Sequence, residues 1–369
     1  MSTAVEFRGI TKSYAQVPVL QDVNLTIETG TFTVIYGVPA CGKSVLVRLL
    51  TGLEHPDSGQ IFLRGQDVGA VEPGARNIGY VPQMFALYPH YRVYDNIAYP
   101  LSLMKVPKEE IDATVHEVAK QIKIDHLLEK YPDQLSGGEK QRVALARGVV
   151  KHTDVYALDD PLVGLDFKLR EQLFDDLRDM QESLQATFVY TTSDPLETLA
   201  LADHVAILDG GRIAETGPIE EVYRTPRHVR SMELLGFPAS NLLSGHLAMR
   251  DDRLWCQAHV FDFPVQPVHT DFAPAEPTEA AVVIRPQAIV LDTAPDSGML
   301  QCQAHVVLRD DLGGEWVLYL DVEGTSLVTV VPHAHDQTVS QDVLTIGVYP
   351  SDMAVFAPDT GEHIGYGAA

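Results

Sequence analysis

Gly37-Val-Pro-Ala-Cys-Gly-Lys-Ser44 follows the pattern G-x-x-x-x-G-K-[ST]. The run Thr31–Gly37 before it is short, rich in β-branched residues and ends in glycine, which is typical of a buried strand. The run Val45–Leu53 after it has helical spacing. A glycine-rich loop between a strand and a helix cradles phosphates with backbone N–H groups. A glycine-rich turn with a solvated lysine is the alternative, and it fits this context less well. We therefore predict that Lys43 reaches the β- and γ-phosphates of a nucleotide and that Ser44 binds Mg²⁺.

Outside this loop, the first part of the chain alternates strand-like and helix-like patterns. Residues 154–160 and 186–192 are further buried-strand candidates. Asp159 ends the first of these runs, where a carboxylate that assists Mg²⁺ lies in phosphate-transfer enzymes. Asp160 follows and is placed to orient an attacking water. An Asp-Asp pair at a strand end can also be turn chemistry or a helix cap, but a phosphate-binding loop earlier in the chain favours the metal role.

The pattern of the chain changes beyond Gly236. Before it, residues 107–130 have the period of an amphipathic helix, and residues 204–217 resemble a hairpin that turns on two glycines. After it, short alternating runs separated by Pro and Gly predict a small β-barrel or sandwich. We therefore expect one domain at 1–236 and another at 237–369.

Composition and charge narrow the class of protein. The chain has 369 residues and a formal charge of −24, from 27 Lys plus Arg against 51 Asp plus Glu. From Phe237 onward there are four Arg, no Lys and 18 acidic residues. Binding nucleic acid over a broad surface needs clustered cations, so we expect no nucleic-acid partner. The three cysteines are far apart in the sequence, so we expect free thiols. No apolar run is long enough to span a bilayer and no signal peptide is visible, so we expect an intracellular protein.

A second glycine-containing segment, Leu135–Arg147 (LSGGEKQRVALAR), has Ser136, Gly137 and Gly138 at a predicted helix start, which makes a second anion-binding surface. This segment resembles the signature sequence of the ABC transporter ATPases, and the resemblance covers the whole chain. In that family the signature closes over the γ-phosphate of ATP held by the opposite subunit. The implied fold is an α/β P-loop ATPase with a helical subdomain at about 84–150, followed by an all-β, OB-like regulatory domain.

The resemblance also implies ATP and Mg²⁺ as cofactors and gives further residues a role. Tyr14 matches the aromatic residue that stacks on adenine, Gln83 matches the loop glutamine that senses Mg²⁺ and the membrane subunits, and Asp166 lies in the dimer-contact loop. The implied nucleotide contacts are Tyr14, Gly37, Cys41, Gly42, Lys43, Ser44, Val45, Ser136, Gly137, Gly138, Gln141 and Asp159. The implied metal ligands are Ser44, Gln83 and Asp159.

Three further stretches resemble the carbohydrate importers within the family. Leu87–Leu101 looks like the matching stretch of their ATPases. The segment Ile284–Gln287 (IRPQ) and the turn Asp359–Gly361 (DTG) resemble elements of the regulatory domain in maltose-type and glycerol-phosphate-type ATPases. The resemblance therefore implies two transmembrane permease subunits, an extracellular solute-binding protein and a peripheral location on the cytoplasmic face of the membrane.

Several positions depart from the family pattern. Asp160 stands where a glutamate usually orients water, and Ser193 stands where a histidine usually contacts the γ-phosphate. Val45 replaces a hydroxyl residue after Ser44. Because general-base and γ-phosphate contacts contribute about 10²–10⁴ in rate, we expect binding of ATP to persist and hydrolysis at this site to be slow.

These observations predict the ATP-binding subunit of an importer for a carbohydrate, a polyol or a sugar-phosphate-like solute. Because the signature is intact while Asp160 and Ser193 are altered, we expect a non-identical second ATPase chain as partner. Two alternatives stay open. One is a homodimer with two slow sites, and the other is a nucleotide-binding regulatory protein that is not coupled to transport.

Overall fold

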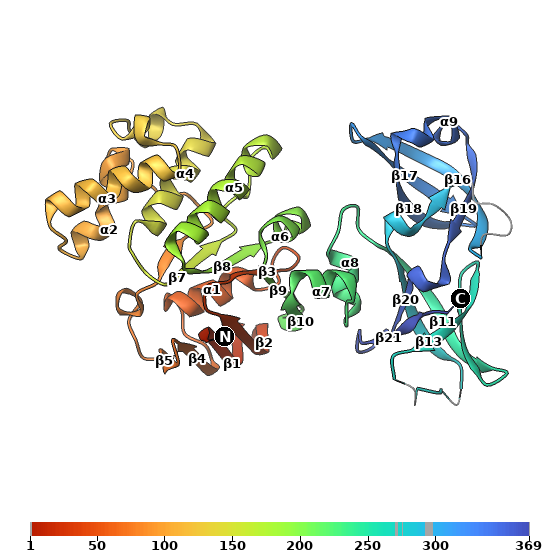
Figure 1. Cartoon of the computed structure of the whole chain (residues 1–369). Helices are drawn as coiled ribbons and strands as arrows, with labels where there is room; N and C mark the ends of the chain where they lie inside the picture. Colours follow the sequence, from red (N-terminus) through yellow and green to blue (C-terminus); the bar gives the residue numbers. More distant parts are fainter. Residues whose placement is uncertain (1, 270–271, 275, 292–297, 369) are drawn as a thin grey trace. The chain divides into compact units, whose positions relative to one another are not determined.

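The computed structural model describes residues 2–269, 272–274, 276–291 and 298–368 (Figure 1). The chain forms two compact units, Met1–Ile219 and Glu220–Ala369, so the division lies before the predicted boundary at 236–237. The reason is that residues 220–236 pack with the C-terminal strands. Met232 joins a buried apolar cluster with Val283 and Phe356, and the Arg285 side chain donates to the Leu235 carbonyl at 2.9 Å.

The central sheet of the N-terminal unit has the order β10-β9-β3-β8-β7-β6. Its strands are β3 (Phe32–Tyr36), β6 (Gly79–Val81), β7 (Val155–Asp159), β8 (Thr187–Thr192), β9 (His204–Asp209) and β10 (Arg212–Pro218). All neighbours are parallel except the β9–β10 hairpin. Strands β3, β7 and β8 are buried along their whole length, which explains their continuous apolar sequences. The predicted strands and the predicted hairpin are confirmed.

A second sheet, in the order β2-β1-β4-β5, packs against the central one. Its strands are β1 (Thr3–Tyr14), β2 (Val17–Glu28), β4 (Ser58–Leu63) and β5 (Gln66–Asp67). Helix α1 (Lys43–Thr51) contributes Leu46 to the apolar core that both sheets share, with Val5 from β1 and Val189 from β8. Helix α1, which follows the glycine-rich loop, is therefore anchored in the core that the two sheets share.

The helical region contains α2 (Val93–Leu103), α3 (Lys108–Gln121) and α4 (Gly137–Val149). The helix predicted over 107–130 ends early, because Lys123 has a φ of 61°, a left-handed conformation that cannot continue a helix. A short 3₁₀ turn, η2 (Asp125–Leu127), follows. Buried Asp176 of α5 (Phe167–Leu184) pairs with Arg142 of α4 and, at 2.9 Å, with Lys123. This ion-pair cluster links the signature helix α4 to α5.

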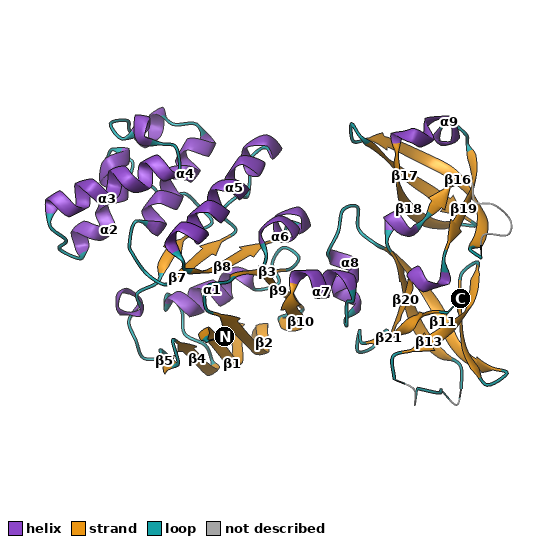
Figure 2. Cartoon of the chain, in the orientation of Figure 1, coloured by secondary structure: helices purple, strands orange, loops and turns teal. Residues whose placement is uncertain are grey.

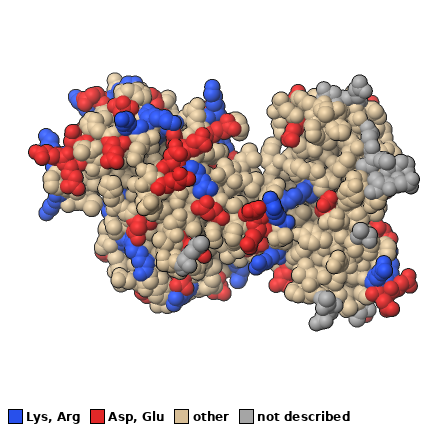
Figure 3. Space-filling model, in the orientation of Figure 1, with Lys and Arg blue, Asp and Glu red and all other residues tan. Residues whose placement is uncertain are grey.

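The remaining short elements of the N-terminal unit are η1 (Pro73–Arg76), η3 (Pro132–Gln134) and α6 (Pro195–Leu201). Figure 2 shows helices around the sheets in this unit and mainly strands in the C-terminal unit. Among the described residues, no helix is long and apolar enough to cross a membrane. On the face drawn in Figure 3, lysines and arginines are interspersed with acidic side chains over the N-terminal unit, whereas most of the C-terminal unit's surface carries neither.

The C-terminal unit holds a closed barrel, β11-β12-β13-β21-β20-β14, and a five-stranded sheet, β15-β19-β16-β17-β18. The barrel strands are β11 (Asn241–Arg250), β12 (Arg253–Ala258), β13 (Phe261–Pro267), β14 (Thr278–Ile284), β20 (Met353–Phe356) and β21 (His363–Gly367). The sheet strands are β15 (Val290–Leu291), β16 (Leu300–Asp311), β17 (Glu315–Val322), β18 (Thr325–Pro332) and β19 (Val343–Val348). Helices α7 (Ile219–Arg224), α8 (Val229–Leu234) and α9 (Asp336–Val339), with 3₁₀ turns η4 (Pro286–Ala288), η5 (His333–His335) and η6 (Pro350–Asp352), complete the described elements. The prediction of a β-rich C-terminal part is confirmed, and the structure has both a closed barrel and a further five-stranded sheet.

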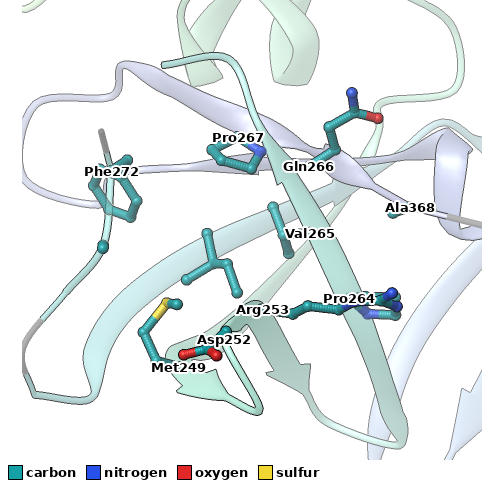
Figure 4. Close-up of a pocket in the computed structure, with 11 residues that line it drawn as sticks. Met249, Asp252, Arg253, Pro264, Val265, Gln266, Pro267, Phe272 and Ala368 are labelled. Atoms are coloured by element: carbon teal, nitrogen blue, oxygen red, sulfur yellow. The ribbon is translucent and has the colours of Figure 1, made fainter. Parts of the chain in front are cut away.

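One apolar core runs through both C-terminal sheets, with Phe263 from the barrel and Leu320 from the second sheet among its buried members. A cavity of about 370 Å³ lies at β12 and β13. Met249, Val265 and Phe272 are among its mainly apolar lining residues (Figure 4). None of the residues that were predicted to bind nucleotide lines this cavity.

Candidate functional site

The parallel strands of the central sheet bring three distant segments to one edge. The loop 37–42 follows β3, Asp159 ends β7, and Ser193 follows β8. Strands β7 and β3 both pair with β8 in parallel register, so their carboxyl ends lie side by side. The edge of an open parallel sheet beyond its carboxyl ends is where such folds bind ligands.

The loop takes its shape from two glycines. At Gly37 a Cβ atom would lie 2.3 Å from the Leu208 carbonyl oxygen, which is too close for any side chain. Gly42, which precedes α1, has a φ of 110°, a conformation that L side chains rarely adopt. The loop therefore needs glycine at both of these positions of the motif.

Lys43 lies folded over the loop and is 6% exposed. Its Nζ donates hydrogen bonds to the carbonyl oxygens of Gly37 at 2.8 Å and Val38 at 2.9 Å. A third bond goes to the Ser193 hydroxyl at 2.8 Å. The ammonium group is thus held at the carboxyl edge of the sheet, where the sequence predicted phosphate binding.

The side-chain oxygens of Ser44 and Asp159, the two residues predicted to assist Mg²⁺, lie in contact. The Ser44 hydroxyl donates to Asp159 Oδ1 at 2.7 Å, and the Thr191 hydroxyl donates to the same oxygen at 3.0 Å. Asp159 is 2% exposed. A hydroxyl and a carboxylate at this separation suit Mg²⁺, which prefers oxygen ligands and is bound through one or two carboxylates plus substrate phosphates. Thr191 was not predicted, although its place in the run 186–192 puts it beside β7.

Asp160 lies directly after this pair. Its backbone has a φ of 44°, and its N–H donates to both oxygens of Thr191, each at 3.0 Å. Burial raises the pKa of the Asp160 carboxyl group, and the positive charge of Lys43 partly opposes this shift. The structure thus places the Asp160 carboxyl group beside the Ser44–Asp159 pair. The backbone hydrogen bonds from Asp160 to Thr191 hold this residue in position.

The Ser193 side chain lies closer to the phosphate site than we expected for a serine at the position of the family's histidine. Its side chain is too short for the reach of an imidazole, but its oxygen contacts Lys43 directly. No local sequence pattern predicts this contact, because Lys43 and Ser193 are 150 positions apart.

The signature segment has an exposed start. Ser136 caps α4 and forms a reciprocal pair with Glu139, since each backbone N–H bonds the other side chain. Ser136 and Gly137 are exposed, and beyond its own helix a side chain at Gly137 would meet open space among the described residues. Gln141 differs, because it is 1% exposed. Its Nε2 has no hydrogen-bond partner among the described residues, and its nucleotide contact stays a prediction.

The other predicted nucleotide contacts lie around the loop. The Tyr14 ring is 42% exposed at the end of β1, and its hydroxyl donates to Glu54, which holds the ring in place. Gln83 is exposed two residues beyond β6. Cys41 is buried, and this burial raises the pKa of its thiol, which makes the thiolate scarce. Val45 is half-buried within α1, and Asp166 caps α5.

A glycine-rich loop with its lysine, a hydroxyl–carboxylate pair suited to Mg²⁺ and a separate exposed helix start are the features expected of a nucleotide-binding ATPase. The comparisons agree with this class. The family described as "ABC transporter" matches residues 20–163. A dimeric ATP-binding cassette, MJ0796 bound to ADP and Pi, superposes with a TM-score of 0.54 at 27% identity, covering 58% of this chain and 98% of the other.

Full-length relatives make the assignment more specific. The sn-glycerol-3-phosphate import ATP-binding protein UgpC 1 of Rhizobium johnstonii is 34% identical, covering 98% of this chain and 96% of the relative. The maltose/maltodextrin import ATP-binding protein MalK of Vibrio parahaemolyticus is 33% identical, covering 96% and 95%. The spermidine/putrescine import ATP-binding protein PotA of Haemophilus influenzae is 36% identical, covering 78% and 77%. This chain belongs to the ABC transporter family, as an ATP-binding protein of the type that UgpC and MalK represent.

Proposed function

We propose that this chain is the ATP-binding subunit of an ABC importer that carries a carbohydrate, a polyol or a sugar-phosphate-like solute. The observation that carries the proposal is that a phosphate-binding loop with its lysine and the Ser44–Asp159 pair lies in a chain similar to import ATP-binding proteins over almost its whole length. The polyamine-import relative is similar over a smaller share of the chain. This difference favours the glycerol-phosphate and maltose types.

Each site residue then has a defined task. The loop N–H groups and Lys43 bind the phosphates of ATP, and Tyr14 stacks on the base. Ser44, Asp159 and Gln83 would hold Mg²⁺, which neutralises phosphate charge when it is bound. Asp160 orients the attacking water, and Ser136 with Gly137 receives the γ-phosphate held by a partner chain.

The predicted helical subdomain is the part of the chain that we propose to couple to membrane subunits, as the resemblance of Leu87–Leu101 to importer ATPases implies. Met84, Leu103 and Met104 in this subdomain are 76%, 65% and 53% exposed. We propose that this subdomain docks onto two permease subunits, which receive solute from an extracellular binding protein. The chain would then lie peripherally on the cytoplasmic face of the membrane.

The second ATPase chain is either a non-identical partner or a second copy of this chain, and each proposal has an observation that supports it. The intact signature beside the altered positions Asp160 and Ser193 supports a non-identical partner with a competent site. The dimeric form of the cassette MJ0796 supports pairing of two identical chains. Purification of the native complex followed by mass spectrometry distinguishes them. Two different ATPase chains support the first proposal, two copies of this chain support the second, and the absence of any permease overturns the importer.

Restoring the usual residues is expected to raise turnover. The double variant Asp160→Glu, Ser193→His should increase ATPase activity of the complex severalfold, because it returns a longer carboxylate and an imidazole to the γ-phosphate region. Steady-state phosphate release from the purified complex measures this effect, with each single variant as a control. Unchanged turnover in a folded double variant would contradict the assignment of Asp160 and Ser193 as the limiting positions.

A further inference from the structure

Arg170 of α5 links three segments that surround the phosphate site. Its Nη2 donates to the Leu165 carbonyl at 3.2 Å, directly before Asp166. Its Nη1 pairs with Asp194, directly after Ser193. Its Nε lies 3.8 Å from the buried carboxylate of Glu197 on α6 and has no hydrogen-bond partner among the described residues. One guanidinium thus spans the loop 160–166, the segment after β8 and helix α6.

The segment that Arg170 contacts is itself closely held. Asp194 caps α6 by accepting the N–H groups of Leu196 at 2.7 Å and Glu197 at 3.3 Å. Buried Glu197 accepts the hydroxyls of Tyr190 at 2.7 Å and Thr192 at 2.6 Å. The carboxylates on both sides of the guanidinium therefore belong to the segment that carries Ser193.

The position of Ser193 depends on this segment, and Ser193 contacts Lys43 at 2.8 Å. We propose that Arg170 is a positioning residue, which locks Ser193 and Asp194 to the start of α5 and so holds Ser193 against Lys43. Because Arg170 also holds the carbonyl before Asp166, it links the proposed dimer-contact loop to the phosphate site. The inference rests on the ATP turnover proposed above.

Arg178 provides a matched control on the same helix. It pairs with Asp203 at 3.0 Å and lies over the Phe32 ring at 5.4 Å, so it also joins α5 to neighbouring segments. Neither Asp203 nor Phe32 is assigned to the phosphate site. The same substitution, Arg178→Gln, removes one arginine ion pair from α5 without touching the segment 192–197.

The test uses the full chain in its native complex and compares Arg170→Gln, Arg170→Lys and Arg178→Gln. Arg170→Gln should lower kcat for ATP about 10- to 100-fold, because misplacement of positioned groups has effects of this size. KM should stay within a factor of about three, because the loop and Lys43 still bind the phosphates. Arg170→Lys should recover part of kcat, since a lysine keeps the charge opposite Asp194 but lacks the fork that spans Leu165 and Glu197. Arg178→Gln should leave kcat close to that of the unmodified protein.

Hydrogen exchange of the backbone amides of Thr192–Thr198 provides a second readout, which does not depend on turnover. Arg170→Gln should speed exchange there, and Arg178→Gln should not. Equal losses of kcat in Arg170→Gln and Arg178→Gln, or unchanged kcat and exchange in Arg170→Gln, would overturn the positioning role. If the unmodified complex does not hydrolyse ATP, the proposed turnover fails, and the exchange comparison alone decides whether Arg170 holds the segment.

Discussion

Ser136→Asp is expected to abolish ATP turnover of the assembled ATPase pair while leaving ATP binding at this chain's own loop intact. Ser136 is exposed and caps α4 through its hydroxyl. Aspartate caps helices as well as serine does, so α4 should keep its start. The added negative charge would, however, oppose the γ-phosphate that we propose to meet this surface. We expect turnover to fall at least about 100-fold, because like charges placed together cost several kcal/mol.

Ser136→Asn tests whether the charge of the aspartate, and not its size, causes the loss of turnover. Asparagine caps a helix and resembles aspartate in size but is neutral, so it should retain much more turnover than aspartate. Ser183→Arg, an exposed change on α5, controls for surface substitution. Phosphate release measures turnover, and titration of the isolated chain with a fluorescent ATP analogue measures binding. Full turnover with Ser136→Asp would disprove a role for this helix start at the partner's nucleotide.

Lys43→Met should weaken binding of ATP with Mg²⁺ to this chain about 10- to 100-fold, because each hydrogen bond to a charged group contributes about 1.5–3 kcal/mol. Methionine keeps the length of the buried side chain but removes the ammonium that bonds Gly37, Val38 and Ser193. Isothermal titration with ATP and Mg²⁺ measures the loss, and Lys120→Ala on the exposed face of α3 is the control.

The outcome that would contradict this prediction is unchanged affinity in a folded Lys43→Met variant. It would mean that the loop N–H groups alone bind the nucleotide, and that Lys43 serves mainly to close the loop through its carbonyl bonds. Loss of the melting transition, or a melting temperature far below that of the unmodified chain, would instead show that the fold needs the lysine. Measuring thermal unfolding beside the titration separates these two cases.

Local motifs determined much of the site, because their chemistry depends on residues close together in the chain. The spacing from Gly37 to Ser44 placed the loop, Lys43 and the start of α1 correctly, and an apolar run located Asp159 at the end of β7. The signature segment led to the family, which the full-length relatives confirm. The change near Gly236 from helical periods to short alternating runs located the β-rich part. The division between the two units lies earlier, at 219–220, since α7 and α8 are short helices that pack with the following strands.

Only the tertiary structure decided which distant residues meet. Parallel pairing of β3, β7 and β8 brings the loop, Asp159 and Ser193 to one edge, although Lys43 and Ser193 are 150 positions apart. Arg170 had no motif of its own, and its role became visible when α5 placed it between Leu165 and Asp194. The burial of Gln141 likewise depends on how α4 packs. Spacing along the chain predicts chemistry within a turn or a loop, whereas contacts between strand ends and helices depend on the order of strands in the sheet.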